Sequence, residues 1–103
     1  MMDLTNQTLV QGEHRAITIT VLDRNNTAVI PTSASTFKVT DDDGVEVLVE
    51  ANATVSSNNM TGIITTAVTA TVGRYYIIWG IIDEDGYRYY HKTLLQVVSL
   101  LST

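Results

Sequence analysis

Two short acidic runs are the first candidates for chemistry, because hard cations such as Ca²⁺ bind where several oxygen ligands converge. Residues 41–43 read Asp-Asp-Asp before Gly44, and residues 83–85 read Asp-Glu-Asp before Gly86. Neither run has the spaced ligands of an EF-hand loop. An Asp-Gly pair also suits a hairpin tip, because Asp tolerates and Gly prefers a positive φ. We interpret both runs as solvated hairpin tips and keep a calcium site as the alternative.

Side chains that could act as nucleophiles or bases do not form a recognisable catalytic set. The only two histidines are His14, which is flanked by Glu13 and Arg15, and His91. We interpret both as exposed or half-buried structural residues. No serine lies in a Gly-x-Ser-x-Gly elbow, and the dispersed glycines form no phosphate-binding loop. The sequence therefore predicts a protein that is not an enzyme and has no cofactor and no metal site.

Most of the aromatic side chains gather between residues 75 and 90. Tyr and Trp are enriched at protein interfaces, although some aromatic residues must also fill the core. Trp79 alternates with two isoleucines, which favours a place in the core. The candidates for a contact surface are Tyr76, Tyr87 and Tyr90.

The apolar C-terminal segment, residues 94–101, is longer than a normal edge strand. Exposed apolar ends are costly unless something covers them. One way to cover this segment is docking to another subunit, which would add Leu100 and Leu101 to the contact surface. The other is packing on the chain's own fold as the last strand. Both alternatives remain open at the level of the sequence.

Composition limits the size, the partners and the location of the protein. The 103 residues suffice for one domain, 1–103, with one core. A formal net charge of −5 with only six scattered Lys and Arg residues argues against nucleic acid as a partner. No apolar stretch approaches a membrane span, and the first residues do not resemble a signal peptide, so we expect a cytoplasmic origin without a membrane partner. The absence of cysteine excludes disulfides and thiolate metal sites.

Alternation of apolar and polar residues predicts a series of strands. The predicted strands cover residues 16–22, 36–40, 45–49, 60–68, 74–82 and 87–98. In the third of these, Val45, Val47 and Val49 share one face, and Gly62 marks a bulge in the fourth. Segment 74–82 is apolar on both faces, so it is either central in a sheet or covered by a partner. The two acidic runs join their flanking strands as antiparallel hairpins.

The order of these elements indicates the fold class. Turns recur every eight to twelve residues, and no segment of useful length has helical periodicity. About seven short antiparallel strands without helices are typical of a β-sandwich.

Four stretches of the chain resemble small immunoglobulin-like proteins of tailed bacteriophage virions, found in head, neck and baseplate components. They are 11–13 (Gln-Gly-Glu), 21–25 (Val-Leu-Asp-Arg-Asn), 39–44 (Val-Thr-Asp-Asp-Asp-Gly) and 72–79 (Val-Gly-Arg-Tyr-Tyr-Ile-Ile-Trp). Gly73-x-Tyr75 is similar to the tyrosine corner of immunoglobulin-like folds, where a phenol hydroxyl satisfies a backbone group. Antibody-type kinship is excluded, because there is no cysteine pair and Trp79 lies on a late strand. The fold class we expect is an all-β, immunoglobulin-like antiparallel β-sandwich.

The resemblance implies a non-enzymatic structural or accessory protein of a virion, assembled in the bacterial cytoplasm. Its partners would be other virion proteins or copies of itself in a symmetric oligomer. The alternative function is a ligand-binding or adhesive β-sandwich module, because sandwiches present aromatic residues to carbohydrate and acidic loops to calcium. An enzyme is the third and least favoured reading, because no nucleophile, base and orienting group occur together.

Overall fold

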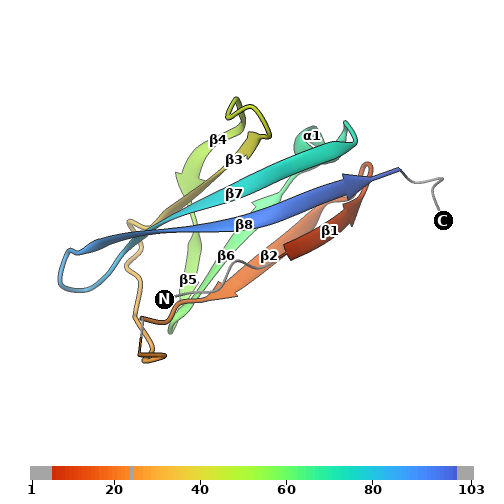
Figure 1. The fold of residues 1–103 in the computed structure, drawn as a ribbon. Helices are drawn as coiled ribbons and strands as arrows, with labels where there is room; N and C mark the ends of the chain where they lie inside the picture. The colour runs from red at the N-terminus through yellow and green to blue at the C-terminus, as the bar shows by residue number, and fades with distance from the viewer. Residues whose placement is uncertain (1–5, 24, 100–103) are drawn as a thin grey trace.

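The computed structural model describes residues 6–23 and 25–99, which form eight strands and one helical turn (Figure 1). The elements are β1 (Asn6–Val10), β2 (Arg15–Thr20), β3 (Thr36–Asp41), β4 (Glu46–Asn52), β5 (Thr54–Ser56), β6 (Asn59–Ile64), α1 (Thr66–Thr69), β7 (Gly73–Ile82) and β8 (Arg88–Val98). A five-stranded sheet has the order β1-β8-β7-β3-β4, and a three-stranded sheet has the order β2-β6-β5. The two sheets enclose one core, which confirms the predicted all-β, immunoglobulin-like sandwich. The one helical turn in the described part of the chain is not long enough to cross a membrane.

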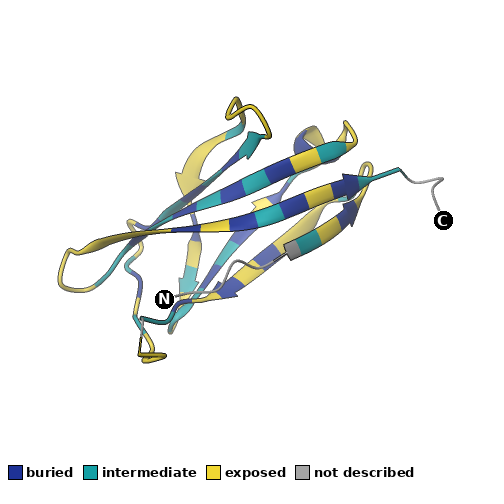
Figure 2. Ribbon diagram, viewed as in Figure 1, coloured by how far each residue is buried: buried dark blue, intermediate teal, exposed yellow. Residues whose placement is uncertain are grey.

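Strand β7 is the central strand of the larger sheet, as predicted from its two apolar faces. Its odd-numbered residues from Tyr75 to Ile81 are buried, and its even-numbered residues from Tyr76 to Ile82 are half-buried. This alternation is visible along β7 and β8 in Figure 2. The hairpin of β7 and β8 stays in register from Gly73 to Ile82. The central strand therefore has one face in the core and one face directed outward.

Trp79 is a core residue, as predicted, with no exposed surface. Its ring lies 5.8 Å from the Phe37 ring, measured between centroids. Trp79 Nε1 donates a buried hydrogen bond of 2.9 Å to Thr93 Oγ1. A buried indole N–H needs such an acceptor, because an unpaired donor costs about 1–3 kcal/mol. The core is therefore centred on an aromatic pair whose polar atom is satisfied.

The tyrosine corner predicted at Tyr75 is present. Tyr75 Oη donates a 2.7 Å hydrogen bond to the carbonyl oxygen of Thr71, four residues earlier. The ring itself is buried in the core. The contact fixes the connection between α1 and the first residues of β7.

Strand β1 departs from a wholly antiparallel arrangement, because it pairs with β8 in parallel. Parallel pairing needs a long connection between the strands, and here nearly the whole domain lies between them. The pairing buries Leu9 completely. In β8, Leu95 and Val97 are buried and Leu94 is half-buried, so the described part of the apolar segment packs on its own sandwich.

Val45, Val47 and Val49, which are predicted to share one face of a strand, have different surroundings. Val45 is 59% exposed and Val49 is 74% exposed, whereas Val47 packs against the core. The pairing of β3 with β4 shifts register twice, between Phe37 and Val39 and again just after Val39. Each shift breaks the alternation of faces that the sequence pattern assumed.

The predicted strand at residues 60–68 is also only partly correct. Strand β6 ends at Ile64, and the chain then forms the helical turn α1, which buries Val68 and Thr69. The predicted bulge at Gly62 is absent, because β2 and β6 pair without a register shift through Gly62. Gly62 has a packing role instead: a Cβ atom there would lie 2.8 Å from Cδ2 of Phe37.

Candidate functional site

The outward face of the five-stranded sheet carries the candidate site. Cross-strand pairing sets Gly80 of β7 between Thr36 of β3 and Tyr90 of β8. All three residues face away from the core, because they alternate with buried neighbours on each strand. A glycine between two side chains leaves a hollow in the sheet surface.

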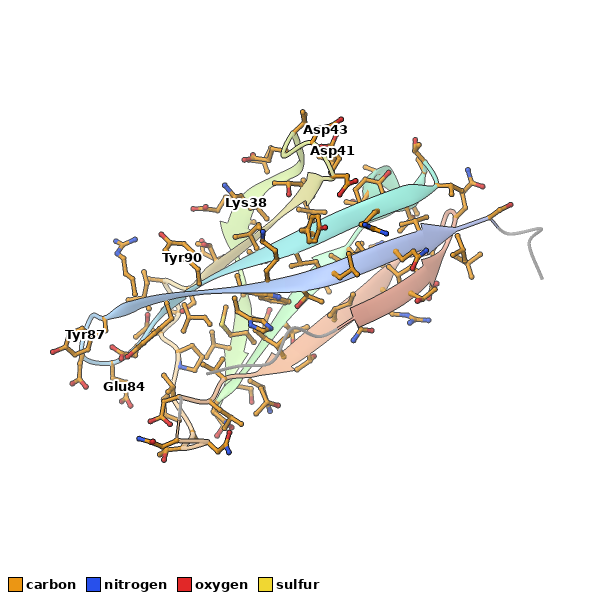
Figure 3. All side chains as sticks on the ribbon, viewed as in Figure 1. Lys38, Asp41, Asp43, Glu84, Tyr87 and Tyr90 are labelled. Atoms are coloured by element: carbon orange, nitrogen blue, oxygen red, sulfur yellow. The ribbon has the colours of Figure 1, made fainter. Side chains whose placement is uncertain are left out.

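The hollow over Gly80 is a depression of about 230 Å³. We call it the Gly80 depression. Its lining includes Thr36, Glu50, Gly80, Arg88 and Tyr90, together with Ala34, Ile81, Ile82 and Tyr89. The Tyr90 side chain is 74% exposed, so its ring is available at the wall of the depression. Figure 3 shows Tyr90 and Lys38 projecting from the same side of the sheet.

The side chains around the depression combine one apolar surface with several polar groups. The Tyr90 ring offers an aromatic face with a negative quadrupole, which attracts the weakly positive C–H groups of a ligand. Glu50 accepts hydrogen bonds, Arg88 donates them, and the Thr36 hydroxyl does both. A hollow with an aromatic wall and a few convergent polar groups is typical of a small-molecule site.

The predicted contact tyrosines do not form one cluster. Tyr76 lies on the same face as Tyr90 but four residues from Gly80 along β7, a distance of about 13 Å. The Lys92 Nζ atom lies 5.1 Å from the centre of the Tyr76 ring, a cation–π contact. Tyr87 is 65% exposed at the β7–β8 loop, away from the sheet face (Figure 3). Leu100 and Leu101 lie outside the described residues.

Cationic residues that are scattered along the sequence gather on the outward face of the five-stranded sheet. They are Lys38, Arg74, Arg88 and Lys92. In the part of the chain that the structure describes, the one ion pair joins Arg15 to Glu13, on the connection into β2. Side chains alternate between the two faces of a strand, and this alternation is the signal in the sequence that could have revealed the cationic face.

The acidic runs are hairpin tips in which the first Asp holds the loop together. Asp41 Oδ1 accepts hydrogen bonds of 2.9 Å from the backbone N–H of both Asp43 and Val45. Asp83 Oδ1 accepts from Asp85 N at 3.0 Å and from Tyr87 N at 2.9 Å. Both loops use a carboxylate as an internal cap for the turn.

A third loop has the same construction, although no Asp-Gly pair marks it in the sequence. Asp23 Oδ1 accepts from Asn25 N at 2.8 Å and from Thr27 N at 3.0 Å. Asn26 takes the positive φ that glycine takes in the two acidic loops. The acidic loops lie at opposite ends of β7, because Asp41 pairs with Tyr75 and the other loop follows Ile82. Among the described residues, no three His, Cys, Asp or Glu side chains come together as a metal-binding group.

His91 differs from its predicted half-buried or exposed position. It is only 8% exposed and lies opposite Trp79 on the core face of the sheet. Desolvation lowers the pKa of His91 below its usual value of 6.5, because burial penalises the charged imidazolium. His14 is exposed, in the connection between β1 and β2. The structure therefore gives these two histidines separate surroundings.

Tyr89 lies at the edge of the Gly80 depression and contacts the β7–β8 loop. Its hydroxyl donates a 3.2 Å hydrogen bond to Asp83 Oδ2. Partial desolvation raises the pKa of Tyr89, and the negative charge of Asp83 adds to the rise. The phenol is therefore a neutral donor that ties β8 to its own hairpin loop.

A second, broader hollow of about 600 Å³ lies at the opposite end of the β7–β8 hairpin. Its lining includes Asp42, Arg74, Gln96 and Ser99. The residues that line it include no aromatic side chain. The Gly80 depression is the better candidate, because it combines enclosure, an aromatic wall and polar groups.

No family model and no curated protein matches this sequence. A solved structure that is similar is CopC from Methylosinus trichosporium OB3b, with a TM-score of 0.69 and 16% sequence identity. The match covers 96% of this chain and 89% of that chain. At this identity the likeness shows the sandwich fold and nothing finer.

The interpretation of this chain as a structural or accessory protein of a phage virion is wrong, and this comparison corrects it. The similar solved structure is a bacterial CopC and not a virion component. The described residues of the four stretches behind that interpretation are strand, turn and tyrosine-corner residues of the sandwich itself. Such residues recur wherever the fold occurs, and a fold serves many unrelated functions. The chain is thus similar in fold to CopC, and its function has to be argued from its own surface.

Proposed function

We propose that this protein is a ligand-binding β-sandwich module that binds carbohydrate at the Gly80 depression. The observation that carries the proposal is the exposed Tyr90 ring standing beside a hollow whose floor is Gly80. A sugar ring has one face of C–H groups and an edge of hydroxyls. The C–H face can stack on the aromatic ring, and the hydroxyls can form hydrogen bonds with the polar side chains around it.

The size and openness of the site favour the binding of one sugar ring of a longer glycan chain. The depression of about 230 Å³ is smaller than the roughly 300–1,000 Å³ of pockets that enclose drug-sized ligands. It lies on the open face of the sheet, where a polymer can extend in both directions along the strands. A module that holds one ring of a glycan chain fits this geometry.

The lining of the depression supports binding without hydrolysis. Most glycoside hydrolases use two carboxyl groups on either side of the scissile bond. Glu50 is the one carboxylate among the described residues that line the depression. We therefore propose a binding module and not an enzyme.

Titration calorimetry with a panel of soluble oligosaccharides tests the proposal. Tyr90→Ala removes the aromatic wall and should weaken binding by at least about tenfold, which corresponds to about 1.4 kcal/mol. Tyr87→Ala is the matched control, because Tyr87 is an exposed tyrosine of the same hairpin outside the depression. Equal affinity of the Tyr90→Ala variant and the wild type would contradict the proposal, and so would the absence of binding to any oligosaccharide of the panel.

A further inference from the structure

The outward face of the five-stranded sheet has a charge opposite to that of the whole chain. The formal net charge is −5, with only six basic residues. Four of these basic residues lie on the outward face: Lys38, Arg74, Arg88 and Lys92. Of the other two, Arg15 lies in the smaller sheet and Arg24 is outside the described residues.

Three of these cations flank the Gly80 depression. Arg88 is part of its lining. Lys38 and Lys92 both lie opposite Ile78, which is two residues before Gly80 on the same face of β7. This separation is about 7 Å along the strand. Positive charge therefore lies on both sides of the depression in the strand direction.

Lys38 and Lys92 lie close enough for one anionic group to contact both. They stand on β3 and β8, which are separated by β7, so their backbones are about 10 Å apart. The Lys92 Nζ atom lies over the Tyr76 ring, 5.1 Å from its centre, and a flexible stem lets each lysine swing toward an anion bound over Ile78. Like charges on one sheet face repel, and an anion between them turns that repulsion into two attractions. Neither lysine takes part in an ion pair among the described residues.

The acidic side chains around this face lie on the edge strand and at Asp42, whose Oδ1 accepts a 3.5 Å hydrogen bond from Tyr76 Oη. Glu46 pairs with Thr40, and Glu50 lines the depression; both belong to the edge strand β4. None of the described outward-facing residues of β7 and β8 is acidic. An anionic ligand is therefore attracted to β7 and β8 between Ile78 and the β7–β8 loop, and kept away from β4 and from Asp42.

We propose that the carbohydrate bound at the Gly80 depression is acidic, with a carboxylate or sulfate group held over Ile78 by Lys38 and Lys92. This inference rests on the proposed function, because the ring next to the anionic group stacks on Tyr90. The shared chemistry is a negatively charged substituent at a distance of about one sugar unit from the stacked ring. Arg88 lines the opposite side of the depression, where it can donate hydrogen bonds to a second anionic group.

The test compares an oligogalacturonate with its methyl ester, in which each carboxylate is replaced by an uncharged ester group. Affinities are measured by titration calorimetry at low and at high salt. The wild type should bind the oligogalacturonate at least about tenfold more tightly at low salt, and the preference should shrink as salt screens the charges. Lys38→Gln and Lys92→Gln should each lose most of this preference and leave binding of the ester unchanged. Arg15→Gln is the control, because it removes one positive charge from the other sheet.

The outcomes separate this inference from the proposed function. Equal affinity for the two glycans, with both weakened by Tyr90→Ala, overturns the acidic ligand and keeps the carbohydrate site. If neither glycan binds and no oligosaccharide of the neutral panel binds, both proposals are overturned. Chondroitin sulfate, compared with its desulfated form, distinguishes sulfate from carboxylate as the anion. If polyglutamate binds as tightly as the oligogalacturonate, and Tyr90→Ala does not change its affinity, the ligand is an acidic protein and the inference is contradicted.

Discussion

Tyr90 of β8 lies directly opposite Gly80 of β7, and the site exists because Gly80 has no side chain. A Cβ atom at Gly80 would lie 3.8 Å from Cε1 of Tyr90 and 2.9 Å from Oγ1 of Thr36. The hollow is therefore narrow enough for a single methyl group to change its shape.

Gly80→Ala should reduce ligand binding and also lower stability. The added methyl group fills the floor of the depression, and we expect a loss of affinity of about tenfold. The new Cβ atom would lie 2.9 Å from Thr36 Oγ1, so the stiff Thr36 side chain must shift, and we expect the free energy of unfolding to fall by about 1–3 kcal/mol. Calorimetric titration and urea denaturation check the two effects. Unchanged affinity would show that the ligand does not enter the depression.

The buried hydrogen bond between Trp79 and Thr93 should be visible in a double-mutant cycle. Thr93→Val leaves the indole N–H without this acceptor, and we expect a loss of about 1–3 kcal/mol in the free energy of unfolding. In a Trp79→Phe background the same substitution should cost less, because there is no N–H to satisfy. Denaturant unfolding of the four proteins measures the coupling. Strictly additive effects would contradict the role of this bond.

The tyrosine corner should stabilise the fold by about 1 kcal/mol. Tyr75→Phe keeps the buried ring and removes the hydrogen bond to the Thr71 carbonyl, whose typical net contribution is about 0.5–1.5 kcal/mol. Tyr87→Phe is the control at an exposed position and should have an effect within about 0.5 kcal/mol. Thermal and urea unfolding compare the two variants. A similar effect of both would argue that the Tyr75 hydroxyl makes no specific contribution.

The buried His91 should make the protein less stable in acid. Its pKa in the folded state is lowered by desolvation below the usual 6.5 of an unfolded chain. Between these two pKa values the unfolded state binds more protons, so stability rises with pH in this window. The contribution is fully present above pH 6.5 and is lost as the pH falls toward the folded-state pKa. Urea unfolding from pH 7.5 to 5 should show a slope that His91→Gln reduces and that His14→Gln, at an exposed position, does not change.

Local patterns predicted much of the sandwich because the information lies within single strands and turns. Alternation placed Trp79 and its strand in the core, and the Asp-Gly pairs placed the two acidic loops at hairpin tips. The likeness of Gly73-x-Tyr75 to a tyrosine corner predicted a hydrogen bond from the phenol to a backbone group, which the structure places at Thr71. Each of these features needs only neighbours in the sequence, so the sequence by itself determined them.

The tertiary structure decided what depends on partners that are distant in the sequence. Two register shifts against β3 exposed Val45 and Val49, and packing over the core turned residues 66–69 into α1. The Gly80 depression needs three strands in one register, and the cationic face needs residues that lie up to 54 positions apart, Lys38 and Lys92. A strand's own pattern says which residues share its face, but not which strand lies beside it or at what offset. Pairing between distant strands is set by the closure of the whole sandwich, so the site could be recognised only after the chain had been folded.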